Sequence, residues 1–65
     1  MFGERLRECR IEKEFTQNQL AEKLLITQST LGKYERGELQ PNIETIKALC
    51  KILDVSSDYL LGIEK

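Results

Sequence analysis

The side chains best suited to bind another molecule lie in a central segment that is polar but almost free of charge. Within residues 24–34 no residue is acidic, and Lys33 is the only charged one. The segment offers the amide of Gln28 and the hydroxyls of Ser29 and Thr30. An amide can pair with adenine through a donor and an acceptor, a threonine methyl can meet a thymine methyl, and lysine can reach guanine. Together these residue types predict a surface that reads base edges in DNA, although each of them alone is more often part of an ordinary solvated surface.

The starts of two expected helices are also free of acid. Thr16, Gln17 and Asn18 form one start and Thr27 opens the other, and all four are uncharged. Free backbone N–H groups and a partial positive charge make helix N-termini suitable for phosphate. An acidic residue there would stabilise the helix but repel DNA. We therefore expect phosphate contacts at these four residues.

Helical periodicity and capping residues predict five short helices. Thr16 and Gln19 fit a capping box, in which each side chain bonds the backbone N–H of the other residue. Phe15 and Leu20 flank the box and fit a hydrophobic staple. No stretch alternates with period two, so we expect no strand. The expected helices span residues 3–13, 17–24, 28–36, 43–53 and 57–61.

Helices this short are not stable alone in water, so they must pack on one another. A chain of 65 residues buries only about 60% of the surface that its unfolded form exposes, and its core must be efficient. We expect a single all-α domain that covers residues 1–65. Its expected core consists of Leu6, Leu20, Leu24, Ile26, Leu31, Ile46, Leu49, Val55 and Leu60.

The composition argues against catalysis and metal binding. The chain has no histidine and only two isolated cysteines, Cys9 and Cys50, which are too few ligands for a zinc site. A disulfide between them is open in principle, but both occupy apolar positions of helical patterns, and we expect free thiols in the core. No nucleophile is paired with a base and no glycine-rich loop could cradle a phosphate. We expect no enzyme, no metal, no cofactor and no small-molecule ligand.

Charge and hydropathy point to a cytoplasmic protein with a local binding surface. No apolar run approaches the roughly 20 residues of a membrane helix. The N-terminus is charged where a signal peptide would be apolar. The net charge of −1 counts against a general polyanion binder, but it permits a sequence reader whose positive charge is local.

Three segments of the chain resemble the lambda-repressor and Cro-like helix-turn-helix family of phage and bacterial regulators. They are FTQNQLAEKL, ITQSTLGKYERG and PNIETIKALCKILDVSSDYLLG, and together they cover most of the sequence. The resemblance implies a compact five-helix DNA-binding domain with a central helix-turn-helix. It also implies that helix 28–36 enters the major groove and contacts bases with its first turns. The implied contacts are Gln28, Ser29, Lys33 and, as a further candidate, Thr30 for bases, and Gln17, Arg36 and Asn42 for phosphates.

The resemblance also implies a homodimer on double-stranded DNA. One half-site per subunit would bind weakly, so a roughly palindromic operator is expected, with half-sites about 34 Å apart. By resemblance the dimer surface is the last helix and tail, residues 59–65. Exposure of Tyr59, Leu61 and Ile63 would support this surface, and the alternative is a frayed chain end.

Arg10 and Glu35 stand where the family often pairs an arginine of the first helix with a glutamate of the third. We favour a partly buried pair that fixes the first helix against helix 28–36. The alternative is two independent, solvated charges. If the pair is buried, removal of one partner would cost about 3–5 kcal/mol.

The chain departs from the family at three helix ends, where glycine is common and this sequence has Glu14, Leu25 and Asp54. A positive φ at these residues would store strain, least at Asp54. Leu25 matters most because it lies in the turn that aims helix 28–36. Gly32, inside that helix, costs roughly 1 kcal/mol relative to alanine. Either the backbone approaches the duplex there, or the position is an unselected part of the surface.

Two functions from different classes follow from these observations. The leading one is a sequence-specific DNA-binding transcriptional regulator, with repression as the expected effect. The alternative is a protein-interaction module that keeps the fold without binding DNA. The low net charge and the single lysine within helix 28–36 keep this alternative open.

Overall fold

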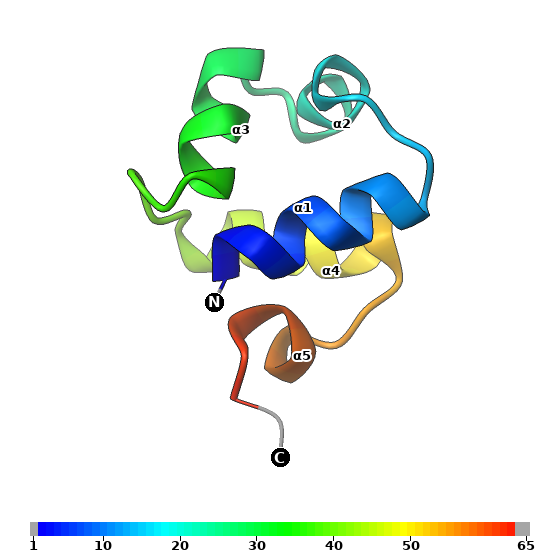
Figure 1. Cartoon of the computed structure of the whole chain (residues 1–65), viewed down its shortest axis with the longest axis vertical. Helices are drawn as coiled ribbons and strands as arrows, with labels where there is room; N and C mark the ends of the chain where they lie inside the picture. The colour runs from blue at the N-terminus through cyan, green and yellow to red at the C-terminus, as the bar shows by residue number, and fades with distance from the viewer. Residues whose placement is uncertain (1, 64–65) are drawn as a thin grey trace.

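The computed structural model describes residues 2–63, which form five α-helices and no strand within that range (Figure 1). The expected all-α class is therefore confirmed. The helices are α1 (Phe2–Glu12), α2 (Gln17–Leu24), α3 (Gln28–Glu35), α4 (Ile43–Leu53) and α5 (Ser57–Leu61). Every boundary agrees with the expected one to within one residue. The third helix ends at Glu35 because Arg36 serves as its C-cap.

Side-chain caps begin four of the helices. Thr16, Thr27, Asn42 and Ser56 have extended backbones, and each accepts a hydrogen bond from the backbone N–H three residues later, at 3.1, 3.1, 2.9 and 3.0 Å. The capping box is confirmed, because the backbone N–H of Thr16 also donates to the side chain of Gln19 at 2.9 Å. These bonds satisfy N–H groups that have no partner inside the helix.

The residues that follow α1, α2 and α4 turn the chain through the left-handed region. The φ angles are 62° at Glu14, 61° at Leu25 and 57° at Asp54, as expected from the missing glycines. A side chain at such a φ crowds the following carbonyl and stores strain. Leu25 lies in the turn between α2 and α3 with 92% of its surface exposed, so no packing of its side chain offsets the strain.

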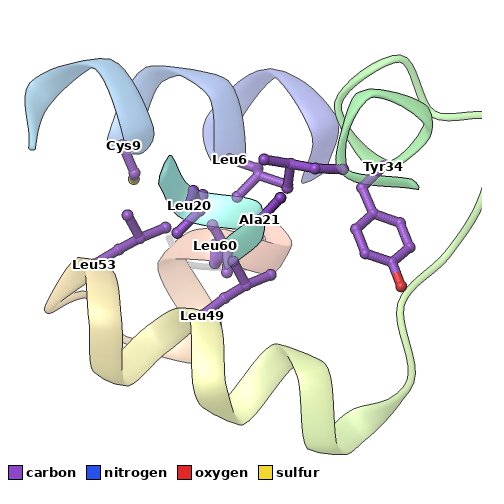
Figure 2. Packing of buried hydrophobic residues seen from close by; sticks show 9 residues of the cluster. Leu6, Cys9, Leu20, Ala21, Tyr34, Leu49, Leu53 and Leu60 are labelled. Atoms are coloured by element: carbon purple, nitrogen blue, oxygen red, sulfur yellow. The ribbon is translucent and has the colours of Figure 1, made fainter. Parts of the chain in front are cut away.

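The core lies where the five helices meet, and Figure 2 shows leucines of α1, α2, α4 and α5 pointing toward one another, with Tyr34 at one side of them. Cys9 and Tyr34 lie within this cluster besides the leucines. Six leucines are almost completely buried, at least one from each helix, because the short helices leave room for only one shared centre. The cluster consists of Leu6, Cys9, Leu20, Ala21, Leu31, Tyr34, Leu49, Leu53 and Leu60.

Four expected core residues lie at the edge of this cluster or outside it. Leu24, Ile26 and Val55 are only partly buried and pack against the cluster. They stand at a helix end or in a turn, where neighbouring helices do not surround a side chain. Ile46 is partly exposed and outside the cluster, so its place in the centre was wrongly predicted. Leu53 takes that place, because α5 packs against α4 and draws the cluster toward the end of α4.

Two contacts fix the position of α3. It packs against α2, to which a short turn joins it, and against α1 (Figure 1). Gly3 of α1 approaches α3 so closely that a Cβ would collide with the backbone carbonyl of Glu35. Only glycine fits such a close approach. Within residues 2–63, no helix has the length and apolar character needed to cross a membrane.

Candidate nucleic-acid interface

The first turns of α3 place uncharged polar side chains in solvent. Gln28, Ser29 and Lys33 are exposed, whereas Leu31 of the same helix is completely buried. Thr30 is only partly exposed, and its hydroxyl lies 2.9 Å from that of the capping Thr27. The structure thus brings three of the four expected base-reading residues to an open surface and leaves the fourth at its margin.

The N-termini of α2 and α3 carry no acid in their first turns, whereas α4 has Glu44 and α5 has Asp58 there. Thr16, Asn18 and Thr27 are exposed at these two acid-free starts. Backbone N–H groups at such ends present a partial positive charge that attracts phosphate. Asn42 is the exposed cap of α4, but the neighbouring Glu44 makes that helix start less favourable for an anion.

A buried ion pair joins α1 to the end of α3. Arg10 Nε donates to Glu35 Oε2 at 2.7 Å, and Arg10 Nη2 donates to Glu35 Oε1 at 3.3 Å. The side chains are 11% and 3% exposed. Arg10 Nη1 also donates to the carbonyl of Phe15 at 2.9 Å, which ties the chain before α2 to the same group. No buried side-chain nitrogen or oxygen within the described residues lacks a partner.

Hydrogen bonds continue from this pair to the start of α3. Gln17 Nε2 donates to Glu35 Oε1 at 3.0 Å, and Gln28 Nε2 donates to Gln17 Oε1 at 3.1 Å. A carboxylate only accepts, so Gln17 must turn its amino group toward Glu35 and its carbonyl toward Gln28. Gln28 must then donate to Gln17, which leaves its carbonyl oxygen and one N–H available. The network therefore sets the orientation of Gln28 before any ligand arrives.

Arg36 lies just beyond α3 in a second ion pair, which the sequence analysis did not anticipate. Its Nε donates to Glu38 Oε2 at 2.9 Å and its Nη2 to Glu38 Oε1 at 3.4 Å. The hydrogen bond from Arg36, and then its charge, hold the pKa of the Glu38 carboxyl below its usual range. Glycine at position 37 was the available sequence signal, because it lets the chain fold back after a helix and brings Glu38 to Arg36.

Gly32 is buried, so its interpretation as part of the exposed surface is wrong. The group nearest to an added Cβ would be the guanidinium of Arg36, with Nη1 at 3.0 Å. The side chain of Arg36 therefore lies back along α3 and covers Gly32. The approach of this backbone to a duplex stays a prediction.

The last described turn carries exposed apolar groups. Leu61 and Ile63 are 39% and 65% exposed, whereas Tyr59 is only partly so. Arg5 of α1 donates from Nη1 to the carbonyl of Tyr59 at 3.1 Å, and its guanidinium lies 4.6 Å from the centre of that ring. Arg5 thus holds α5 against α1, a contact that the sequence analysis missed. Residues 64 and 65 of the expected dimer surface lie outside the described range.

Neither cysteine is placed for chemistry. Both thiols are free, Cys9 is buried and Cys50 is partly so. Burial raises the pKa of each thiol, which keeps both protonated at neutral pH and lowers their reactivity. Within residues 2–63, no three side chains of metal-binding type gather at one place.

Known proteins resemble this chain in both sequence and structure. A prophage-derived helix-turn-helix-type transcriptional regulator of Bacillus subtilis, YonR, is 48% identical over 94% of this chain and 56% of its own length. The P22 c2 repressor in complex with a synthetic operator matches 92% of this chain and 91% of its own, with 35% identity and a TM-score of 0.87. The biofilm regulator SinR in complex with DNA matches 94% and 98%, with 35% identity and a TM-score of 0.85.

These matches extend over the whole five-helix arrangement, although the chain spans only about half the length of the curated relatives it matches. The family model for the helix-turn-helix matches residues 6–60, from the first buried leucine of α1 to the buried leucine of α5. The chain therefore belongs to the helix-turn-helix family and has its lambda-repressor-like fold.

Proposed function

We propose that this chain is a sequence-specific DNA-binding transcriptional regulator that inserts α3 into the major groove of double-stranded DNA. The observation that carries the proposal is the hydrogen-bonded chain from Glu35 through Gln17 to Gln28. It orients an exposed amide at the first position of α3 without using all of its hydrogen-bonding groups. A side chain held in this way loses little freedom on binding. The P22 c2 repressor, which shares the fold, is solved in complex with an operator.

The proposed base contacts are Gln28, Ser29, Thr30 and Lys33. Gln28 has a free acceptor and a free donor for adenine, Ser29 can do either, and Lys33 reaches guanine or phosphate. Thr30 differs, because its hydroxyl is 2.9 Å from Thr27 Oγ1. We assign its methyl group to contact a thymine methyl.

The proposed phosphate contacts lie at helix starts and beside the end of α3. The backbone N–H groups at the starts of α2 and α3 point to two neighbouring phosphates, and Gln17 can contact one of them while it holds Gln28. Few of these residues carry charge, so non-specific binding is weak and the affinity depends little on salt. The proposed residues are Thr16, Gln17, Asn18, Thr27, Arg36 and Asn42.

A homodimer on a palindromic operator completes the proposal. The exposed Leu61 and Ile63 support a surface around residues 59–65, because a second copy would remove their apolar groups from water. Two copies related by a two-fold axis would place their α3 helices in successive major grooves, about 34 Å apart. A repressor would act by occupying the operator. Since the relatives are regulators of bacteria and their phages, we expect this protein to act in the cytoplasm.

Selection from random double-stranded DNA tests the proposal. The chain is incubated at low salt with a library of random duplexes, and bound DNA is recovered and sequenced through successive rounds. We expect one enriched, roughly palindromic motif. Gln28→Ala should lose the preference at one base pair in each half-site, whereas Glu8→Gln on α1 should select the same motif. Failure to enrich any motif contradicts the proposal and favours a protein-interaction module. A reporter gene placed behind the selected motif then distinguishes repression from activation.

A further inference from the structure

Arg36 shares a stripe of α3 with Gln28. Residues four apart lie on one side of a helix, so Gln28, Gly32 and Arg36 follow one another along a single line. The guanidinium of Arg36 extends back over Gly32, where its Nη1 lies 3.0 Å from the position of an added Cβ. Because Gly32 has no side chain, the guanidinium can lie flat against the helix. Arg36 thus belongs to the face that α3 presents to DNA under the proposed function.

One edge of Arg36 that can bind phosphate, formed by Nε and Nη2, is already occupied. Glu38 accepts hydrogen bonds from Nε at 2.9 Å and from Nη2 at 3.4 Å. Two adjacent N–H groups of a guanidinium form the fork that holds a carboxylate or a phosphate through two parallel bonds. The carboxylate of Glu38 therefore occupies a place that a phosphate could take.

The end of α3 holds Glu38 in this position. Gly37 has a φ of 77°, and its N–H donates to the carbonyl of Tyr34 at 3.2 Å. The N–H of Glu38 donates to the carbonyl of Lys33 at 2.9 Å. These two bonds fix the backbone of Glu38 beside the helix. The side chains stay open to solvent, with 57% of Arg36 and 54% of Glu38 exposed, so a competing anion can reach them.

We propose that Glu38 is a specificity-determining residue that competes with DNA phosphate for Arg36 and thereby weakens binding to duplexes of any sequence. This inference rests on the proposed function. A phosphate contact carries no sequence information, so an arginine free to make one would strengthen every complex. With Glu38 in place, Arg36 reaches phosphate only when base contacts hold the backbone close enough to displace the carboxylate. An operator provides that hold, and random DNA does not.

The test compares the unmodified chain with Glu38→Gln on a random-sequence duplex and on the selected operator, over about 50 to 200 mM salt. We expect Glu38→Gln to tighten binding to the random duplex by about fivefold at low salt. The plot of log affinity against log salt should steepen by about 0.9, the slope of one added phosphate contact. The operator affinity should rise less, so the ratio of the two affinities falls. Glu8→Gln makes the same charge change at an exposed position of α1 and should leave the random-duplex slope unchanged.

A second substitution separates competition for Arg36 from simple repulsion between Glu38 and DNA. In an Arg36→Gln background, Glu38→Gln should have no effect on the random duplex, because the contact it releases is gone. If Glu38→Gln has the same effect in both backgrounds, Glu38 acts through its own charge and the inference is wrong.

The remaining outcomes separate this inference from the proposed function. An operator selected by the unmodified chain, together with equal random-duplex binding of Glu38→Gln and Glu8→Gln, overturns the inference and leaves the function standing. If the unmodified chain binds no duplex at low salt, both are overturned. Equal thermal unfolding midpoints of the variants show that the comparison is made between folded proteins.

Discussion

Two consecutive residues at the end of α3 each form an ion pair. The inner pair of Glu35 with Arg10 is buried, and the outer pair of Arg36 with Glu38 is exposed. Glu35 faces inward and binds Arg10 at 2.7 Å, with its side chain 3% exposed. Arg36 faces outward and binds Glu38 at 2.9 Å, with its side chain 57% exposed. The charges and distances are similar, so the pairs differ mainly in their contact with water.

This difference gives the two pairs different capabilities. In the inner pair, water cannot replace a lost partner, so the side chains of Arg10 and Glu35 are held in place. Glu35 can therefore orient a further side chain, that of Gln17. Water and salt screen the outer pair, which contributes little to stability and can exchange its partner. A structural ion pair at Glu35 and an exchangeable ion pair at Arg36 therefore occupy neighbouring positions in the chain.

The inner pair should give the largest effect. We expect Glu35→Gln to lower the free energy of unfolding by about 3–5 kcal/mol, because Arg10 stays buried without an opposite charge. Urea unfolding followed by circular dichroism measures this. The double substitution Arg10→Met with Glu35→Leu should recover much of the loss, since it removes both charges together. An unchanged midpoint for Glu35→Gln would show that the inner pair is no stronger than the outer one.

Substitution of Gly32, which lies beneath Arg36 of the outer pair, should change the stability less and in the opposite direction. Gly32→Ala should raise the free energy of unfolding by about 1 kcal/mol through better helix propensity. The new Cβ meets only the flexible end of Arg36, which can move aside. Gly3→Ala is the matched control, because its Cβ would collide with the backbone of α3 and should destabilise the protein. Thermal unfolding of both variants tests this prediction. Destabilisation by Gly32→Ala would show that Arg36 cannot move aside, so that the contact above Gly32 is as rigid as the contact between Gly3 and α3.

The turn that leads into α3 extends the comparison from charge to backbone. Leu25→Gly should raise the free energy of unfolding by up to about 1 kcal/mol, because it relieves the strain at a φ of 61° without loss of a buried side chain. The greater freedom of glycine in the unfolded chain offsets part of this gain. Leu25→Ala keeps the left-handed strain and should bring no gain. A large loss of stability on Leu25→Gly in urea unfolding would mean that the exposed leucine contributes to packing.

The outer pair itself should have the smallest effect on folding. In the folded state Arg36 lowers the pKa of the Glu38 carboxyl. The stabilisation from the pair is therefore fully present above the pKa of this carboxyl in the unfolded chain, and it disappears as the pH falls through the pKa in the folded protein. Exposure keeps this contribution small. An NMR titration of the Glu38 carboxyl should show a higher pKa in Arg36→Gln than in the unmodified chain. Equal values would mean that the two groups do not interact in solution.

The sequence predicted the local features of this protein well. Helix starts follow from caps such as Thr16, whose side chain bonds the backbone only three residues later. The left-handed backbone at Glu14, Leu25 and Asp54 was expected because the resembling family commonly has glycine at these helix ends. The membership of the core was less predictable, as Ile46 shows, because periodicity identifies the inner face of α4 but not where along it α5 packs.

The sequence by itself thus determined where helices begin and end and which polar residues α3 exposes, because those features depend on neighbours within one or two turns. Only the tertiary structure decided how these residues are connected. Gln17 and Glu35 are 18 positions apart, and packing of α2 against α3 had to bring them together. The pair of Arg10 and Glu35, 25 positions apart, was expected only from the family resemblance, and packing of α1 against α3 forms it. The pairing of Arg36 with Glu38 spans two positions, yet it depends on the backbone angle of Gly37 and on exposure to water. Burial, which no local pattern specifies, makes one pair structural and leaves the other free to exchange.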